Sequence, residues 1–72
     1  MTTLSTLATR LQQARLEANM TILDLSEKSD INTHTILAIE AGRTENPRID
    51  TIKRIADALS VDARWLAWGN KI

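Results

Sequence analysis

Residues 21–42 constrain the fold of this chain more than any other stretch. They contain two short segments in which apolar residues recur at three- and four-residue steps, the spacing of one helix face. The first helix would begin at Thr21 and the second at Asn32, because both side chains accept hydrogen bonds from the free amides at a helix start. Two short helices separated by only a few residues predict a helix-turn-helix, a motif whose second helix can enter the major groove of DNA.

Local signals inside this stretch define the two helices further. Asp24 lies three residues after Thr21, which is the spacing of a capping box. Asp30 is expected in the turn, and Gly42 is expected to end the second helix. The residues expected to face the core are Leu25, Ser26, Ile36 and Ile39.

The rest of the chain predicts three further helices. An apolar stripe indicates a first helix over about residues 3–18, which Asn19 would end. The stripe consists of Leu4, Leu7, Leu11, Ala14 and Ala18. Asp50 is expected to cap a fourth helix, and Asp62 a short fifth one that carries Trp65 and ends at Gly69. The expected fold is all-α: one compact five-helix domain over residues 1–72, with its core within about residues 4–69 and a loop over residues 43–49.

Composition excludes several classes of function. The chain has no cysteine and one histidine, His34, so neither a disulfide framework nor a cysteine or histidine metal cluster is available. It has no glycine-rich phosphate loop and no paired carboxylates at a plausible pocket, so we expect no enzyme, no cofactor and no metal. No apolar run approaches the ~20 residues that span a bilayer, and residues 1–7 lack the features of a signal peptide. These observations favour a cytoplasmic domain without membrane contact.

Nine basic and nine acidic residues give the chain a formal net charge of zero. This balance counts against nucleic-acid binding, because lysine and arginine supply much of the affinity for phosphates. The distribution of the charges matters more than their sum, since DNA meets only one face of a domain. DNA binding and protein binding therefore both remain open.

An ordered set of residues over roughly residues 10–69 matches a known pattern. The set is Arg15, residues 21–26, Ile31, Asn32, Ile36, residues 39–42, Pro47, Thr51, Ile52, residues 55–59, Val61, Trp65, Leu66 and Gly69. In this order the residues resemble the Cro/repressor type of helix-turn-helix, the xenobiotic-response-element family that includes lambdoid phage repressor heads. The resemblance implies a five-helix domain that binds specific DNA sequences, usually as a dimer.

The resemblance also implies a role for the outer face of the third helix. In the family, side chains at the matching positions reach the edges of DNA bases, where threonine and histidine can form hydrogen bonds. The candidate base-reading residues are Thr33, His34, Thr35, Leu37 and Ala38. The alternative is an ordinary solvated helix face.

Phosphate contacts are expected on either side of this helix. Arg43 and Arg48 flank a proline-containing loop, with Thr44 between them, and would clamp the DNA backbone. Thr21 and Asn32 lie at helix N-termini, where the backbone amides and the helix dipole favour a phosphate in addition to the cap. The alternative is a pair of surface arginines and two simple caps.

Two further sets of contacts follow from the resemblance. Arg15 and Glu40 match a salt bridge that joins the first helix to the end of the third. The dimer contact of the family involves the loop after the third helix and the region of the fifth. The matching residues here are Pro47, Ile49, Ala63 and Trp68.

We therefore expect a dimeric transcriptional repressor that binds a two-fold symmetric operator in double-stranded DNA. The alternative is an antitoxin-like or coactivator-like module that binds a protein partner through Ile22, Leu23 and Trp68. Ile22 stands where many family members have a phosphate-binding glutamine, and Asp30 stands where glycine is common. These departures and the neutral net charge favour the alternative, whereas the small polar side chains of the third helix favour DNA.

Overall fold

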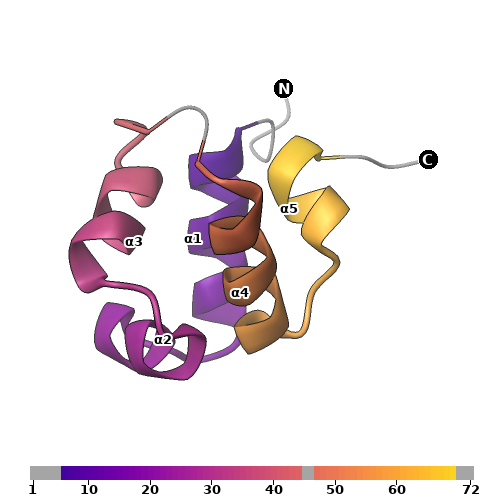
Figure 1. Cartoon of the computed structure of the whole chain (residues 1–72). Coiled ribbons are helices and arrows are strands. Elements are labelled where there is room, and N and C mark those ends of the chain that lie inside the picture. The colour runs from indigo at the N-terminus through magenta and orange to yellow at the C-terminus, as the bar shows by residue number, and fades with distance from the viewer. Residues whose placement is uncertain (1–5, 45–46, 70–72) are drawn as a thin grey trace.

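The computed structural model describes residues 6–44 and 47–69 of the chain, and these residues contain five α-helices joined by short turns and loops. The helices are α1 (Leu7–Glu17), α2 (Ile22–Ser29), α3 (Thr33–Glu40), α4 (Ile49–Leu59) and α5 (Ala63–Trp68) (Figure 1). No strand occurs within these residues. The expected all-α fold of five helices is confirmed.

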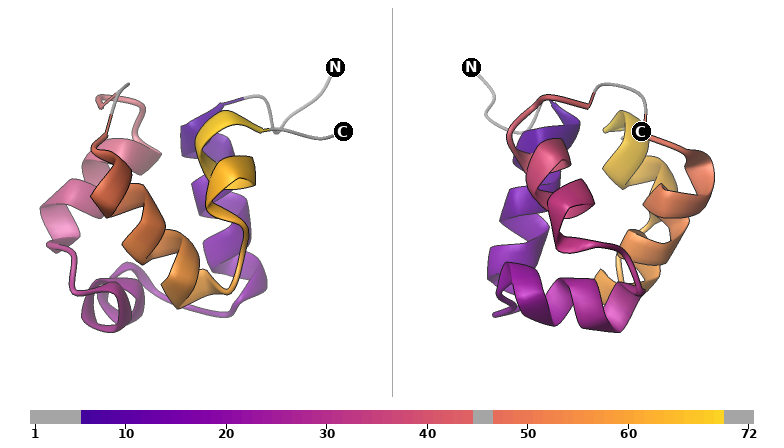
Figure 2. Two further views of the ribbon diagram at one scale, coloured as in Figure 1. Left: turned by 45° about the vertical axis from the view of Figure 1, so that its right-hand side comes forward. Right: turned by 60° about the vertical axis from the view of Figure 1, so that its left-hand side comes forward.

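The helices surround one core, and each helix packs against two others. α1 packs against α3 and α5, while α4 packs against α2 and α5. α2 and α3 also pack against each other, and together they form one side of the domain, with α5 on the other (Figures 1 and 2). This arrangement leaves the outer face of α3 accessible to a ligand.

Short-range cap hydrogen bonds define most of the helix starts. The Thr21 hydroxyl accepts from the Asp24 amide at 3.0 Å, and the Asp24 carboxylate accepts from the Thr21 amide at 3.1 Å, so the predicted capping box is present. The Asn32 side chain accepts from the His34 amide at 2.7 Å. Asp62 caps α5 in the same way, as expected.

The predicted cap of the fourth helix is wrong. α4 begins at Ile49 with Arg48 as its N-cap, and the Arg48 carbonyl accepts from the Ile52 amide at 3.1 Å. Asp50 lies inside the first turn, where its negative charge is favourable at the positive end of the helix dipole. Its carboxylate faces Arg54 one turn further on instead of capping the helix.

The first helix begins later than predicted. Thr6 is its N-cap, because the Thr6 hydroxyl accepts from the Thr9 amide at 3.1 Å, and α1 starts at Leu7. Residues 1–5, which include Leu4 of the predicted stripe, lie outside the described residues. Ala18 is the exposed C-cap and not a core residue. Asn19 follows in the left-handed conformation with φ 58°, as expected for a helix stop.

All five helices contribute to the core. The largest side chains that are fully buried are Leu11, Leu25, Ile36, Ile39, Ile55 and Leu66. Trp65, which was expected in the core, is half-buried and packs against it. Ser26 is half-buried, whereas Ser29 is buried, because Ser29 lies one helical turn after Leu25 and therefore shares its face. The Ser29 hydroxyl donates to the Leu25 carbonyl at 2.6 Å.

A buried arginine that the sequence did not reveal holds α5 against α1. The Arg10 guanidinium donates from Nε to the Leu66 carbonyl at 3.0 Å and from Nη2 to the Ala67 carbonyl at 3.1 Å. Burial lowers the pKa of Arg10, although an arginine remains charged at neutral pH. Gly69 ends α5 with φ 67°, and a Cβ atom added there would lie 2.6 Å from Arg10 Nη1. Arg10 of α1 thus satisfies two carbonyls near the end of α5, in addition to the C-cap that Gly69 provides.

Candidate nucleic-acid interface

The outer face of α3 is the central element of the candidate interface. Ile36 and Ile39 turn inward, which leaves His34 and Leu37 exposed on the opposite side. Ala38 lies one turn after His34 on that side and is half-buried. The other two candidate base-reading residues, Thr33 and Thr35, are also half-buried. The structure therefore gives His34 and Leu37 the freest access to a ligand, with the smaller side chains beside them.

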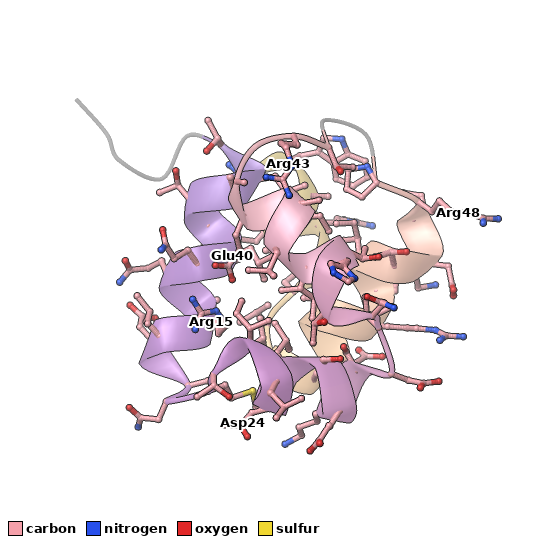
Figure 3. The ribbon with its side chains drawn as sticks, turned by 90° about the vertical axis from the view of Figure 1, so that its left-hand side faces the viewer. Arg15, Asp24, Glu40, Arg43 and Arg48 are labelled. Atoms are coloured by element: carbon pink, nitrogen blue, oxygen red, sulfur yellow. The ribbon has the colours of Figure 1, made fainter. Side chains whose placement is uncertain are left out.

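Two exposed arginines lie in the segment that follows α3. Arg43 follows the C-terminal end of the helix, and Arg48 projects outward from the start of α4 (Figure 3). Thr44, the third candidate in this loop, is half-buried. Residues 45–46 between the two arginines lie outside the described residues. The described part of the loop thus has one exposed cation at each of its two ends.

The N-terminus of α2 has its own negative charge. Asp24 occupies the capping box with Thr21, so a carboxylate already satisfies the amide at this helix start. An incoming phosphate at Thr21 would meet that carboxylate, and like charges repel. The geometry therefore favours the cap over a phosphate contact at Thr21. At Asn32 no carboxylate takes part in the cap, so the start of α3 is the more suitable of the two for an anion.

The start of α4 differs from the other helix starts. In α1, α2, α3 and α5, a side-chain oxygen of the N-cap residue accepts a hydrogen bond from a backbone amide in the first turn. Arg48, the N-cap of α4, provides no such acceptor. The first-turn amides of α4 therefore have no side-chain cap and lie beside an exposed cation, which favours a phosphate oxygen, whereas the Asp50 carboxylate in the same turn opposes one.

Arg15 and Glu40 form a two-pronged ion pair between α1 and the end of α3 (Figure 3). Arg15 Nε lies 2.7 Å from Glu40 Oε2, and Nη2 lies 3.1 Å from Oε1. Arg15 Nη1 also donates to the Met20 carbonyl at 2.9 Å. The two side chains are only 12% and 10% exposed, and the hydrogen bond with Glu40 raises the pKa of Arg15. The pair fixes α3 against α1 and neutralises a carboxylate at the end of α3.

The charge balance of the surface is less basic than that of the sequence. Arg10 and Arg15 are both engaged inside the domain. Among the described residues, six exposed basic side chains face seven exposed acidic ones. One of the basic residues, Arg54, lies close to two carboxylates, with Nη1 3.7 Å from Asp30 Oδ2 and Nε 3.3 Å from Asp50 Oδ2. The charge balance of the described surface therefore gives no general attraction for DNA, which would depend on where individual cations such as Arg43 and Arg48 lie.

An apolar groove of about 300 Å³ lies between α4 and α5. It brings together three of the four predicted dimer residues, Ile49, Ala63 and Trp68, with Lys53, Asp62 and Arg64 around them. Trp68 is 67% exposed and Ile49 is 56% exposed, so both present apolar surface to solvent. Pro47, the fourth predicted residue, is half-buried and does not line the groove.

The residues suggested for a protein partner do not form one surface. Leu23 is exposed on α2, and Ile22 beside it is half-buried and packs against the core. Trp68 lies on α5, on the other side of the domain from α2 (Figures 1 and 2). A single partner surface that joins Ile22, Leu23 and Trp68 is therefore not present in this fold.

Two other kinds of feature are not found in the described residues. No group of three or more histidine, cysteine, aspartate or glutamate side chains there is arranged to hold a metal ion. Within residues 6–44 and 47–69, no helix has the length and apolar character needed to traverse a bilayer.

A comparison with models of protein families identifies a match for most of the chain. A family model described as helix-turn-helix matches residues 11–66, which covers α2, α3 and α4 completely and most of the two outer helices. No match is found among curated proteins.

Proposed function

Because the chain belongs to the Cro/repressor type of helix-turn-helix family, whose members bind DNA and regulate transcription, we propose that it is a dimeric repressor that reads a two-fold symmetric operator. The observation that carries this proposal is the exposed face of α3 with two exposed arginines, Arg43 and Arg48, in the segment that follows it. A helix in the major groove needs cations near it, because phosphates line the edges of the groove.

Sequence is read by the side chains at the start and outer face of α3. His34 is exposed and can donate a hydrogen bond to the guanine acceptors of the major groove. Thr33 and Thr35 beside it can donate, accept or contact a thymine methyl group. Leu37 and Ala38 supply apolar contacts one turn further on. The polar residues select base pairs, and the apolar ones contact methyl groups and exclude water.

The DNA backbone is held by few groups. Arg43 and Arg48 contact phosphates, assisted by Thr44 and by the amides at the starts of α3 and α4. Since the exposed basic side chains do not outnumber the acidic ones among the described residues, non-specific binding is weak. Base readout and dimerisation then account for most of the operator affinity.

The dimer forms through the groove between α4 and α5. Ile49 and Trp68 are exposed apolar side chains at one groove, and burying them against a second copy removes their surface from water. Lys53 and Arg64 lie beside the groove together with Asp62, so a two-fold axis can place opposite charges across the contact. Two α3 helices then read two half-sites about one turn of DNA apart. The bound dimer blocks RNA polymerase and performs no chemistry.

A second candidate function is a protein-interaction module on the same fold. The observation in its favour is the surface charge, with seven acidic and six basic exposed side chains among the described residues. The exposed Trp68 would anchor the partner in this case, because tryptophan is enriched at interfaces.

Selection of bound duplexes from random DNA separates the two functions. For a repressor we expect an enriched motif with two-fold symmetry, and we expect His34→Ala to lose preference at particular positions of that motif. Gln12→Ala, an exposed polar change on α1, is the matched control and should select the same motif as the unchanged protein. Enrichment of no sequence would reject the repressor and leave the protein-interaction module.

A further inference from the structure

Arg54 occupies an unusual position between two carboxylates from different parts of the domain. It lies on α4, with Nη1 3.7 Å from Asp30 at the end of α2 and Nε 3.3 Å from Asp50 in the first turn of α4. Asp30 has the left-handed conformation with φ 60°, which is higher in energy for an aspartate than for a glycine because aspartate has a Cβ atom. The turn before α3 therefore has both a strained residue and a negative charge.

These ion pairs contribute little to the stability of the domain. All three side chains are exposed, Asp30 almost completely at 95%. Exposed pairs are screened by solvent, and ordering two flexible side chains offsets most of their attraction. These three charges therefore act mainly through the electric field that they create outside the domain.

Both carboxylates lie next to the elements proposed to meet DNA. Asp30 precedes Asn32, the N-cap of α3, by two residues. Asp50 follows Arg48, the N-cap of α4, by two residues. An uncompensated carboxylate at either place would repel the phosphates that the two helix starts and Arg48 are proposed to bind. Arg54 is the residue that brings one positive charge close to both.

We propose that Arg54 is a positioning residue for DNA binding, which screens Asp30 and Asp50 so that the starts of α3 and α4 can approach the phosphate backbone. This inference rests on the proposed function, since it assigns a role at the same interface. Arg54 acts here through the two carboxylates and not through a phosphate contact of its own. Replacing it should therefore affect binding only as long as both carboxylates are charged.

The test compares Arg54→Gln in two backgrounds, the unchanged chain and the Asp30→Asn/Asp50→Asn variant. Binding is measured by fluorescence anisotropy on a labelled duplex that carries the selected operator. The measurements are made at 50, 100 and 200 mM NaCl, so that the Debye length falls from above about 10 Å to below it. In the unchanged background, repulsion between these two carboxylates and phosphates at a separation of about 10 Å would correspond to an affinity loss of about two- to fivefold at the lowest salt. In the background without the carboxylates we expect almost no loss. Arg54→Lys, which keeps the charge, should bind like the unchanged protein.

Lys28→Gln is the matched control, because Lys28 is an exposed cation near Asp30 that forms no ion pair among the described residues. It should weaken binding less than Arg54→Gln. An equal loss in both backgrounds, with the salt slope shallower by about 0.9, would show a direct phosphate contact and overturn the proposal. A lower melting temperature with unchanged affinity at 10 °C would also overturn it. If the unchanged protein binds no duplex, the proposed function itself fails, an outcome distinct from normal binding by Arg54→Gln.

Discussion

Replacing Arg10 by methionine should remove much of the stability of this domain. The change deletes the hydrogen bonds that Arg10 donates to the carbonyls of Leu66 and Ala67 but keeps an unbranched side chain in the same space. α5 is only six residues long and depends on external donors, because the last four carbonyls of any helix have no partner inside it. The loss of Arg10 therefore leaves acceptors at the end of α5 unsatisfied.

The size of the effect follows from the burial of these contacts. A hydrogen bond from a charged donor contributes about 1.5–3 kcal/mol, and Arg10 donates one in a buried and one in a partly buried position. Burying the charge costs part of this gain, as the lowered pKa of Arg10 indicates. We expect a net destabilisation of about 2–4 kcal/mol, which for a domain of this size lowers the melting temperature by roughly 10–25 °C. A domain of this length has about 4–11 kcal/mol in total, so the variant would be marginal.

Two signals measure the result separately. Circular dichroism follows all five helices, whereas tryptophan fluorescence follows only α5, which contains both Trp65 and Trp68. Urea unfolding of Arg10→Met should show a lower midpoint in both signals. Arg64→Met is the matched control, because Arg64 is an exposed arginine on α5 and its loss should change stability by about 0.5 kcal/mol or less. A loss below about 1 kcal/mol in Arg10→Met, or one equal to the control, would refute the assigned role of Arg10.

Four further outcomes are expected. Arg43→Ala and Arg48→Ala should each weaken binding to all sequences and reduce the salt slope by about 0.9, as measured by anisotropy across a salt series; an unchanged slope would argue against phosphate contacts. His34→Ala should relax selectivity at particular base pairs by about 1–3 kcal/mol, as measured on duplexes with single base changes; identical discrimination would mean that α3 does not read the bases. Arg15→Met should cost about 2–3 kcal/mol in urea unfolding, between the values for exposed and buried pairs, because its carboxylate partner stays behind half-buried. Ile49→Asp should abolish cooperative operator binding while the circular dichroism spectrum stays helical; unaltered binding to the two-fold site would rule out the groove as the dimer contact.

The helix starts show which parts of the fold a sequence can predict. Thr21, Asn32 and Asp62 were identified as caps because a cap side chain and the backbone amide that donates to it lie only two or three residues apart. The same reasoning failed at Asp50, whose side chain faces Arg54 of the next turn. Local chemistry therefore predicts most helix boundaries, and it fails at α4 because this helix begins at Ile49, before Asp50, and has no side-chain cap.

Long-range placement was harder to predict. Nothing in the sequence singles out Arg10, because its partners lie 56 and 57 residues further along the chain. The pairing of Arg15 with Glu40 was expected only through the family resemblance. The exposed face of α3 was predictable from helical spacing, since Ile36 and Ile39 define its buried side.

Surfaces built from several helices depend on packing. Three of the residues that line the apolar groove, Ile49, Ala63 and Trp68, were expected together because the family pattern included them, whereas Pro47 does not line it. Leu23 and Trp68 were expected to act together, yet α2 and α5 lie on opposite sides of the domain. Spacing along the chain gives the face of one helix, but the relative placement of two helices follows from side-chain packing across the core.

The bond between Arg10 and α5 also has a consequence for biosynthesis. A ribosome makes α1 first and α5 last. Arg10 therefore lacks its two acceptors, the carbonyls of Leu66 and Ala67, until the helix-turn-helix and α4 have been made. During that time its guanidinium stays hydrated, and the side of α1 that α5 will cover stays open to chaperones and proteases. A nascent chain that stops before Leu66 keeps this side exposed. Completion of α5 thus decides whether this side of α1 is covered or exposed to solvent.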